Sequence, residues 1–181
     1  MKRTAGQIVF SPSDLVRYAE SPFASWMDRY HLENPDLLQP DEATEDQELI
    51  AQTGDQHERA VLNEFKASIP GLAEIPKDDF SVARAKTLAS ISGKAPIIYQ
   101  AALESGRFAG YADFLIIKDA EAYQVWDTKL ARSPKPHYAV QLCCYSEMLA
   151  DMTGQQLPER FGIILGSGVL IGAYFVLSGS L

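Results

Sequence analysis

Cysteine is scarce in this chain of 181 residues, which has only Cys143 and Cys144. Neighbouring residues on a helix point about 100° apart, so a disulfide between these two is geometrically poor. The sequence therefore excludes a disulfide framework and indicates a reducing compartment.

The N-terminus lacks a long apolar segment. Lys2 and Arg3 are not followed by the apolar core of about seven or more residues that a secretory signal needs. Internal repeats, low-complexity tracts and a recognisable linker are also missing. We therefore expect one cytoplasmic domain over residues 1–181.

Positive charge is also in short supply: 16 basic residues face 24 acidic ones, giving a net charge of −8. Because non-specific affinity for nucleic acid comes from neutralised phosphates, the whole molecule is not a cationic DNA sleeve. The distribution of charge leaves a local basic strip open. Acidic residues are concentrated between Glu33 and Glu58, whereas Lys129, Arg132, Lys135 and His137 follow one another without an intervening carboxylate.

The remaining composition, 46% hydrophobic and 22% charged, is typical of a globular domain with a packed core. Periodicity predicts helices over residues 11–31, 45–65, 81–92 and 137–152, and strands over 97–103, 110–117, 123–131, 161–166 and 169–177. In the first helix we expect Leu15, Tyr18 or Ala19, Phe23 and Trp26 to face inward, with a break or kink at Pro22. We expect the second helix to be interrupted or relaxed around Gly54.

The segment from Phe161 to Leu181 contains no charged residue and is long enough to span a bilayer. Glycines and serines dilute it, and Gly166-Ser167-Gly168 in its middle is typical of a hairpin between buried strands. We therefore interpret the segment as two strands and expect no membrane attachment.

Asp127-Thr128-Lys129 lies in an apolar strand, so Asp127 and Lys129 project from the same face. Asp113 lies in the preceding strand, and an antiparallel pairing with a turn near 119–121 brings it beside Asp127. Paired carboxylates suit Mg²⁺ or Mn²⁺. The simpler alternative is a surface salt bridge next to a turn aspartate, but the apolar neighbours of both carboxylates make an unpaired charge there costly.

Gln141 and Tyr145 are four residues apart in a predicted helix and share a face, while His57 lies in a polar helical stretch after Gly54. Taken alone, such a pair is usually a helix surface or core edge, and a single histidine is usually a surface or hydrogen-bonded residue.

Taken in order, these residues resemble a known family. His57, Asp113, Asp127-Thr128-Lys129 and Gln141 to Tyr145 match the signature of RecB-like nucleases in the PD-(D/E)xK superfamily in order and spacing. The segments 10–15 and 21–29 are similar to one branch of that family, whose nuclease domain is often joined to helicase modules. The resemblance covers about residues 10–166.

The resemblance implies an α/β fold with a restriction-endonuclease-like core, a central mixed sheet flanked by helices in the order α-β-β-β-α-β. It implies that His57, Asp113, Asp127 and the Thr128 carbonyl bind the metal, and that Lys129 orients or deprotonates the attacking water. Gln141 and Tyr145 would contact DNA or brace the lysine. Arg132 and Lys135, from the basic strip, are further candidates for DNA contact.

The chain departs from many relatives in one respect. They hold an iron-sulfur cluster through one early cysteine and three late ones, but Ser21 stands where the early cysteine is expected. We therefore predict no iron-sulfur cluster. The stretch beyond Gly166 matches nothing in the family, so the chain is open to interpretation as a fragment of a longer protein.

Two functions remain open from the sequence. The first is a Mg²⁺- or Mn²⁺-dependent deoxyribonuclease acting in DNA repair or processing. The second is a non-catalytic nucleic-acid-binding or scaffolding module that keeps the nuclease fold. The complete residue set favours the first, and the acidic charge and short length favour the second.

Overall fold

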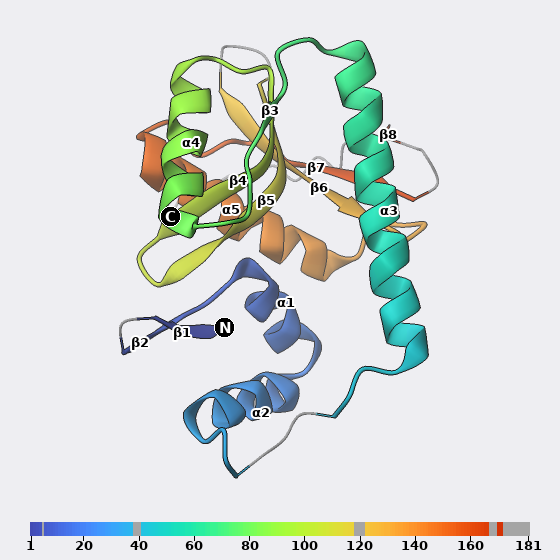
Figure 1. Cartoon of the computed structure of the whole chain (residues 1–181), viewed down its shortest axis with the longest axis vertical. Coiled ribbons are helices and arrows are strands. Elements are labelled where there is room, and N and C mark those ends of the chain that lie inside the picture. The colour runs from blue at the N-terminus through green and yellow to red at the C-terminus, as the bar shows by residue number, and fades with distance from the viewer. Residues whose placement is uncertain (5, 38–40, 118–121, 167–169, 172–181) are drawn as a thin grey trace.

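A computed structural model describes the chain except for residues 5, 38–40, 118–121, 167–169 and 172–181 (Figure 1). Its elements are β1 (Lys2–Thr4), β2 (Gln7–Val9), α1 (Pro12–Glu20), α2 (Pro22–Glu33), α3 (Glu45–Ser68), β3 (Ala73–Glu74), α4 (Phe80–Ser92), β4 (Ile97–Ser105), β5 (Phe108–Ile117), β6 (Tyr123–Lys129), α5 (Pro136–Thr153), β7 (Gly162–Leu165) and β8 (Leu170–Ile171).

A mixed six-stranded sheet in the order β3-β4-β5-β6-β7-β8 forms the centre of the fold. Strand β5 runs antiparallel to its neighbours β4 and β6, whereas β6 and β7 run parallel and are connected by α5. The predicted α/β class, with a mixed sheet flanked by helices, is confirmed. The three successive antiparallel strands and the following helix are also where the sequence pattern put them.

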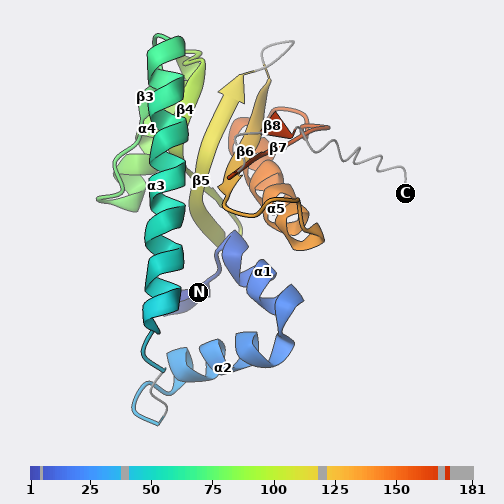
Figure 2. The same cartoon turned by 90° about the vertical axis from the view of Figure 1, so that its right-hand side faces the viewer.

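Helices α3 and α5 lie on opposite faces of the sheet (Figure 2). On the α3 face, Val61 and Leu62 pack against apolar side chains of the strands, including Phe114 and Ile164. On the α5 face, Leu142 and Leu149 belong to a larger buried cluster. That cluster also contains Leu115, Val125, Met148 and Ile163. Both faces of the central strands are therefore buried, and polar side chains there need partners.

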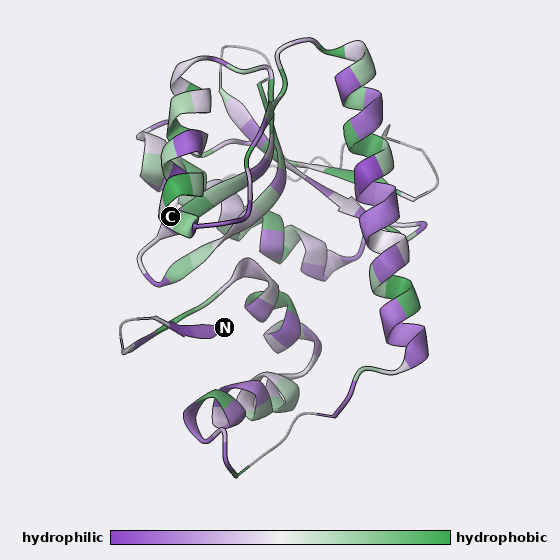
Figure 3. Cartoon of the chain, viewed as in Figure 1, coloured by the Kyte–Doolittle hydropathy of each residue, from purple (hydrophilic) through white to green (hydrophobic). Residues whose placement is uncertain are grey.

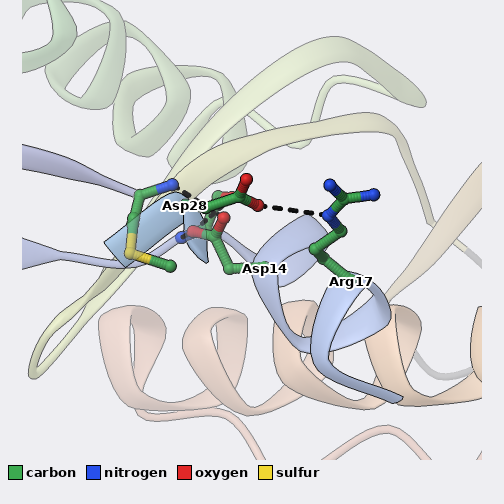
Figure 4. Close-up of polar contacts among 5 residues, drawn as sticks. Asp14, Arg17 and Asp28 are labelled. Atoms are coloured by element: carbon green, nitrogen blue, oxygen red, sulfur yellow. Dashed lines mark hydrogen bonds and ion pairs between the residues drawn. The ribbon is translucent and has the colours of Figure 1, made fainter. Parts of the chain in front are cut away.

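The predicted break at Pro22 is confirmed, since α1 ends and α2 begins at Ser21. The Ser21 hydroxyl accepts a hydrogen bond from the Ala24 amide at 3.2 Å, which caps α2. Figure 4 shows the polar contacts of α1: the Asp14 carboxylate accepts hydrogen bonds from the Ser11 amide and the Met1 amine, and Arg17 pairs with Asp28.

The expectation that the apolar side chains of this region all face inward is wrong. Leu15 packs against the core, but the exposed fractions of Tyr18, Phe23 and Trp26 are 60%, 70% and 54%. Periodicity identifies the apolar face of a helix, but it does not say whether another element covers that face. In the described part of the chain, α1 packs on α5, whereas α2 extends away from the sheet (Figures 1 and 2).

The expected interruption at Gly54 is also wrong, because α3 continues from Glu45 to Ser68. One glycine costs a helix only about 1 kcal/mol relative to alanine, which the capping box of Thr44 and Gln47 and the packing of Val61 and Leu62 offset. Most of α3 is hydrophilic, whereas apolar residues dominate β4 and β5 (Figure 3).

The expected pair of C-terminal strands is present as far as the structure describes this part of the chain. β7 is a buried strand and β8 pairs with it antiparallel, so the chain reverses between them. The rest of the expected strand, 172–177, lies outside the described residues. Within the described part of the chain, no helix is both long enough and apolar enough to cross a membrane.

Candidate active site

Asp113 and Asp127 are brought together by the pairing of β5 with β6. Phe114 pairs with Trp126, so the two aspartates face each other one position beyond that pair. Asp127 is only 4% exposed, because β6 lies between β5 and β7. The structure therefore confirms the convergence of the two carboxylates that the strand pattern predicts.

Asp113 is held by the neighbouring strand. The amide and the hydroxyl of Thr128 both donate hydrogen bonds to its Oδ2, at 2.9 and 2.8 Å. Burial, and then the charge of Asp127, raise the pKa of Asp113 to about 7. Two carboxylates in this position repel each other when both are ionised, so the metal-free protein retains a proton near neutral pH.

Lys129 lies beside Asp127 as the alternation of the strand predicts. Its Nζ is 2.6 Å from Asp127 Oδ2 and 5.5 Å from the centre of the Tyr138 ring. Burial opposes the charge of Lys129, but the Asp127 and Asp113 carboxylates outweigh burial and raise its pKa. Lys129 is therefore an ammonium ion in the metal-free protein. Although close to Lys129, Asp127 Oδ2 has no well-aligned hydrogen bond within the described residues.

His57 lies on α3, and its Nε2 is 3.3 Å from the Ile164 carbonyl oxygen. Ile164 is the partner of Thr128 in the parallel β6–β7 pair, so His57 approaches the strand next to the one that carries Asp127. Within the described residues, no three His, Cys, Asp or Glu side chains form a group ready to hold a metal. The role of His57 as a ligand stays a prediction, as does that of the Thr128 carbonyl.

Gln141 and Tyr145 are both buried on the sheet-facing side of α5. The Tyr145 hydroxyl donates a hydrogen bond to the Tyr111 carbonyl at 2.7 Å, two residues before Asp113. Gly110 leaves room for it, since a Cβ there would lie 2.9 Å from that hydroxyl. In this state Tyr145 braces β5, the strand of Asp113, and not Lys129.

Arg132 and Lys135 are exposed in the connection between β6 and α5. This connection follows Lys129 directly, so both cations lie on the chain leaving the site. Their predicted contact with DNA stays a prediction.

Sequence reasoning missed three polar residues near Asp113: Glu58, Tyr99 and Gln100. The Glu58 carboxylate accepts hydrogen bonds from the side chains of Gln100 and Tyr99. Burial, and then the nearby charge of Asp113, raise the pKa of Glu58. The signal was present in the sequence, because Gln100 interrupts the apolar run 97–103 of a buried strand.

Comparison of the chain with known protein families gave no match, and neither did comparison with characterised proteins.

Proposed function

We propose that the chain is a Mg²⁺- or Mn²⁺-dependent deoxyribonuclease of the RecB-like group, acting in DNA repair or processing. The observation that carries the proposal is the placement of Asp113, Asp127 and Lys129 on adjacent strands with the spacing that the family signature has. A surface salt bridge accounts poorly for this arrangement, because Asp127 is almost fully buried. The order of β4, β5, β6, α5 and β7 further supports a restriction-endonuclease-like core.

The donor set of the site fits a hard divalent cation. Asp113 and Asp127 present carboxylate oxygens, and Oδ2 of Asp127 has no well-aligned hydrogen bond within the described residues. The two carboxylates also repel each other. Carboxylates are the ligands that Mg²⁺ and Mn²⁺ prefer. His57 on α3 and the Thr128 carbonyl on β6 would complete the proposed set of ligands.

Each residue of the site has a separate role in the proposed reaction. Asp113 and Asp127 would hold the cation, both as carboxylates. When bound, the cation supplies hydroxide at neutral pH and neutralises charge on the phosphate. The Lys129 ammonium orients the attacking water and stabilises the charge that develops on the phosphate.

Tyr145 braces the strand of Asp113, and Gln141 forms a hydrogen bond with Tyr145. Arg132 and Lys135 contact DNA phosphates on the chain that leaves the site. We further propose a helicase module as partner, because the segments 10–15 and 21–29 resemble a branch of the family whose nuclease domain is often joined to helicase modules.

A second function rests on a specific observation. The net charge of −8 disfavours tight binding of a polyanion, as expected if the domain is a scaffold that retains the fold without cutting. In that case the carboxylate pair and Lys129 have no catalytic task.

The deciding experiment incubates the purified protein with labelled single-stranded DNA, duplex DNA and RNA in Mn²⁺, Mg²⁺ or EDTA. We expect cleavage of DNA with either cation and none in EDTA. The Asp113→Ala, Asp127→Ala double variant is the control for contaminating nuclease. Equal cleavage by this variant, or none by the wild type with either cation, contradicts the proposal and favours the scaffold.

A further inference from the structure

Beside the carboxylate pair, a second set of polar side chains surrounds a cavity of about 250 Å³. Its lining comes from α3, from β4 and from the segment after β3. The residues are Asp55, Glu58, Arg59, Ile75, Lys77, Tyr99 and Gln100. Ile75 and Gln100 are buried and form the floor, whereas Asp55, Arg59 and Lys77 are exposed at the rim.

Gln100 has a backbone conformation that is rare for its residue type. Its φ of 55° lies in the left-handed region, within a central strand and without a glycine. Such a conformation is energetically costly and persists where the surroundings or a function require it. It turns both Tyr99 and Gln100 toward Glu58 on α3, although consecutive residues of a regular strand point to opposite faces.

The Gln100 side chain is also incompletely satisfied. It is 4% exposed and its Nε2 donates to Glu58, but its Oε1 is buried and has no hydrogen-bond partner within the described residues. A buried acceptor without a donor lowers the stability of the fold, so a ligand donor that reaches it is favoured. The last torsion of a glutamine is soft, so a donor group entering the cavity can meet this oxygen after a small rotation of the amide.

The cavity adjoins the proposed catalytic residues. Tyr99 pairs with Phe114 and Ala101 with Ala112, which puts Gln100 opposite Asp113 on the neighbouring strand. Adjacent strands are about 4.8 Å apart, so the backbones of Gln100 and Asp113 are direct neighbours, although the Gln100 side chain lies on the α3 face of the sheet. Glu58 senses the charge of Asp113, which agrees with this proximity.

The charges of the lining select the class of ligand. The carboxylates of Asp55 and Glu58 offset the cations of Arg59 and Lys77, so the formal charge of the cavity is zero. A phosphate group would meet two carboxylates there. An uncharged group with donors and acceptors suits the amide, phenol and carboxylate of the floor, and the size is below the roughly 300–1,000 Å³ of sites for larger ligands.

We infer that this cavity receives one unpaired nucleobase of the strand being cut, recognised through its hydrogen-bonding edge by Gln100, Glu58 and Tyr99. The inference rests on the proposed nuclease function and names its substrate: a strand that is single-stranded at the site. A stacked and paired base has no edge free for such a cavity, so a duplex substrate must unpair first.

The experiment places an abasic residue at one position at a time in a labelled single-stranded oligonucleotide. Single-turnover cleavage is measured in Mn²⁺, and binding is measured separately in Ca²⁺. We expect one position next to the cut at which loss of the base lowers cleavage and affinity about tenfold or more, as for other buried base contacts.

The variants decide whether the cavity is responsible. Gln100→Met keeps the length of the side chain, and its control is Gln124→Met, because Gln124 is a half-buried strand residue outside the cavity. Lys77→Ala has Lys86→Ala as its control, because Lys86 is an exposed lysine on α4 outside the cavity. Thermal melting shows which variants fold. We expect the abasic penalty to disappear in Gln100→Met and to shrink in Lys77→Ala, and to persist in both controls.

The outcomes separate this inference from the proposed function. If the wild type cleaves DNA but the abasic penalty is absent, or is the same in Gln100→Met and Lys77→Ala as in their controls, the base site is wrong and the nuclease stands. If the protein does not cleave but the penalty on binding depends on Gln100, the site stands and the nuclease is wrong. Absence of both cleavage and binding overturns both.

Discussion

Asp113 carries a raised pKa of about 7 because burial and the Asp127 carboxylate oppose its charge. In the unfolded chain, a carboxyl of this type titrates near pH 4. Between these two values the folded protein binds a proton that the unfolded chain has released. Folding stability from this residue is therefore complete at low pH and is lost as pH rises toward and through 7.

The corresponding substitution is Asp113→Asn, which removes the charge and keeps an acceptor for Thr128. In EDTA at pH 8 we expect its melting temperature to exceed that of the wild type by at least about 3 °C, which is roughly 1 kcal/mol for a domain of this size. The difference should shrink steadily as the pH falls from 8 to 5. Fluorescence-monitored melting across this range is the measurement.

Asp14 provides a contrast of opposite sign within the same molecule. Burial acts to raise its pKa, but hydrogen bonds from the Met1 amine and Ser11 outweigh burial and lower it. Its stabilisation is present above pH 4 and is lost below it. Asp14→Asn should therefore leave the dependence of the melting temperature on pH unchanged between pH 5 and 8.

If Asp113→Asn melts like the wild type at pH 8, the two carboxylates are not in the repulsive contact described above.

We expect substitution of Lys129 to slow the cleavage step. Its ammonium touches Asp127 and adds no oxygen ligand, so Lys129→Ala should keep the fold and metal affinity nearly intact while cleavage slows about 100-fold or more. Lys129→Arg should not rescue fully, because a planar guanidinium cannot replace a compact ammonium. Single-turnover cleavage beside DNA binding in Ca²⁺ is the test.

The exposed Lys135 provides the control for a general loss of positive charge near the site. Lys135→Ala should weaken binding by one phosphate contact and leave the cleavage rate of bound DNA unchanged. Wild-type cleavage by Lys129→Ala would remove Lys129 from the mechanism.

Replacement of glycine by alanine should change the free energy of unfolding in opposite directions at two positions. Gly162 on β7 faces the ring of Trp126, and a Cβ there would lie 2.1 Å from Trp126 Cε3. The ring must move, so we expect Gly162→Ala to lower the free energy of unfolding by about 1–3 kcal/mol. Gly54 on α3 meets only a Leu130 carbon at 3.9 Å, so Gly54→Ala should raise it by about 1 kcal/mol.

Urea unfolding of both variants measures the difference directly. A stabilising Gly162→Ala would show that β7 does not pack on Trp126 as described. A destabilising Gly54→Ala would show that α3 is relaxed at this position, as the sequence alone suggested.

Strands and helices could be predicted from the sequence better than the surfaces they share. The order β4, β5, β6, α5 and β7 follows from local periodicity, and so does the pairing of Asp113 with Asp127, because an antiparallel hairpin joins neighbours in the sequence. The distance of His57 from the site depends on how α3 docks on the sheet. Local patterns hold no information about that docking, nor about the exposed face of α2.

Gln100 shows a different limit of sequence reasoning. A polar residue in an apolar strand is visible in the sequence, but its left-handed backbone and its contact with Glu58 on α3 are not. Non-glycine residues seldom adopt that conformation, so pattern rules predict a regular strand. A site that depends on an exception of this kind becomes visible only in three dimensions.

At the scale of the whole molecule, the net charge of −8 limits how nucleic acid is held. If contact is confined to Lys129, Arg132 and Lys135, about three phosphates are neutralised, and the logarithm of affinity should fall with the logarithm of salt at a slope of roughly −2 to −3. The Arg132→Ala, Lys135→Ala double variant should reduce this slope by about 1.5–2. Titrations in Ca²⁺ at several salt concentrations measure it.

Lys86→Ala, on an exposed part of α4, should leave the slope unchanged. A slope much steeper than this, or one that the double variant does not alter, would place the binding surface elsewhere on the molecule.

The hairpin that brings Asp113 to Asp127 also bears on the order of events in folding. Its contacts join residues close in sequence and form early, whereas α3 docks across more than forty intervening residues. We therefore expect the two carboxylates to approach each other before α3 docks on the sheet. If the pair binds a divalent cation as proposed, the ion should also speed folding by relieving the repulsion between the two carboxylates at that stage. Stopped-flow refolding should accelerate in Mn²⁺ for the wild type, whereas Asp113→Asn should refold at a rate independent of the ion.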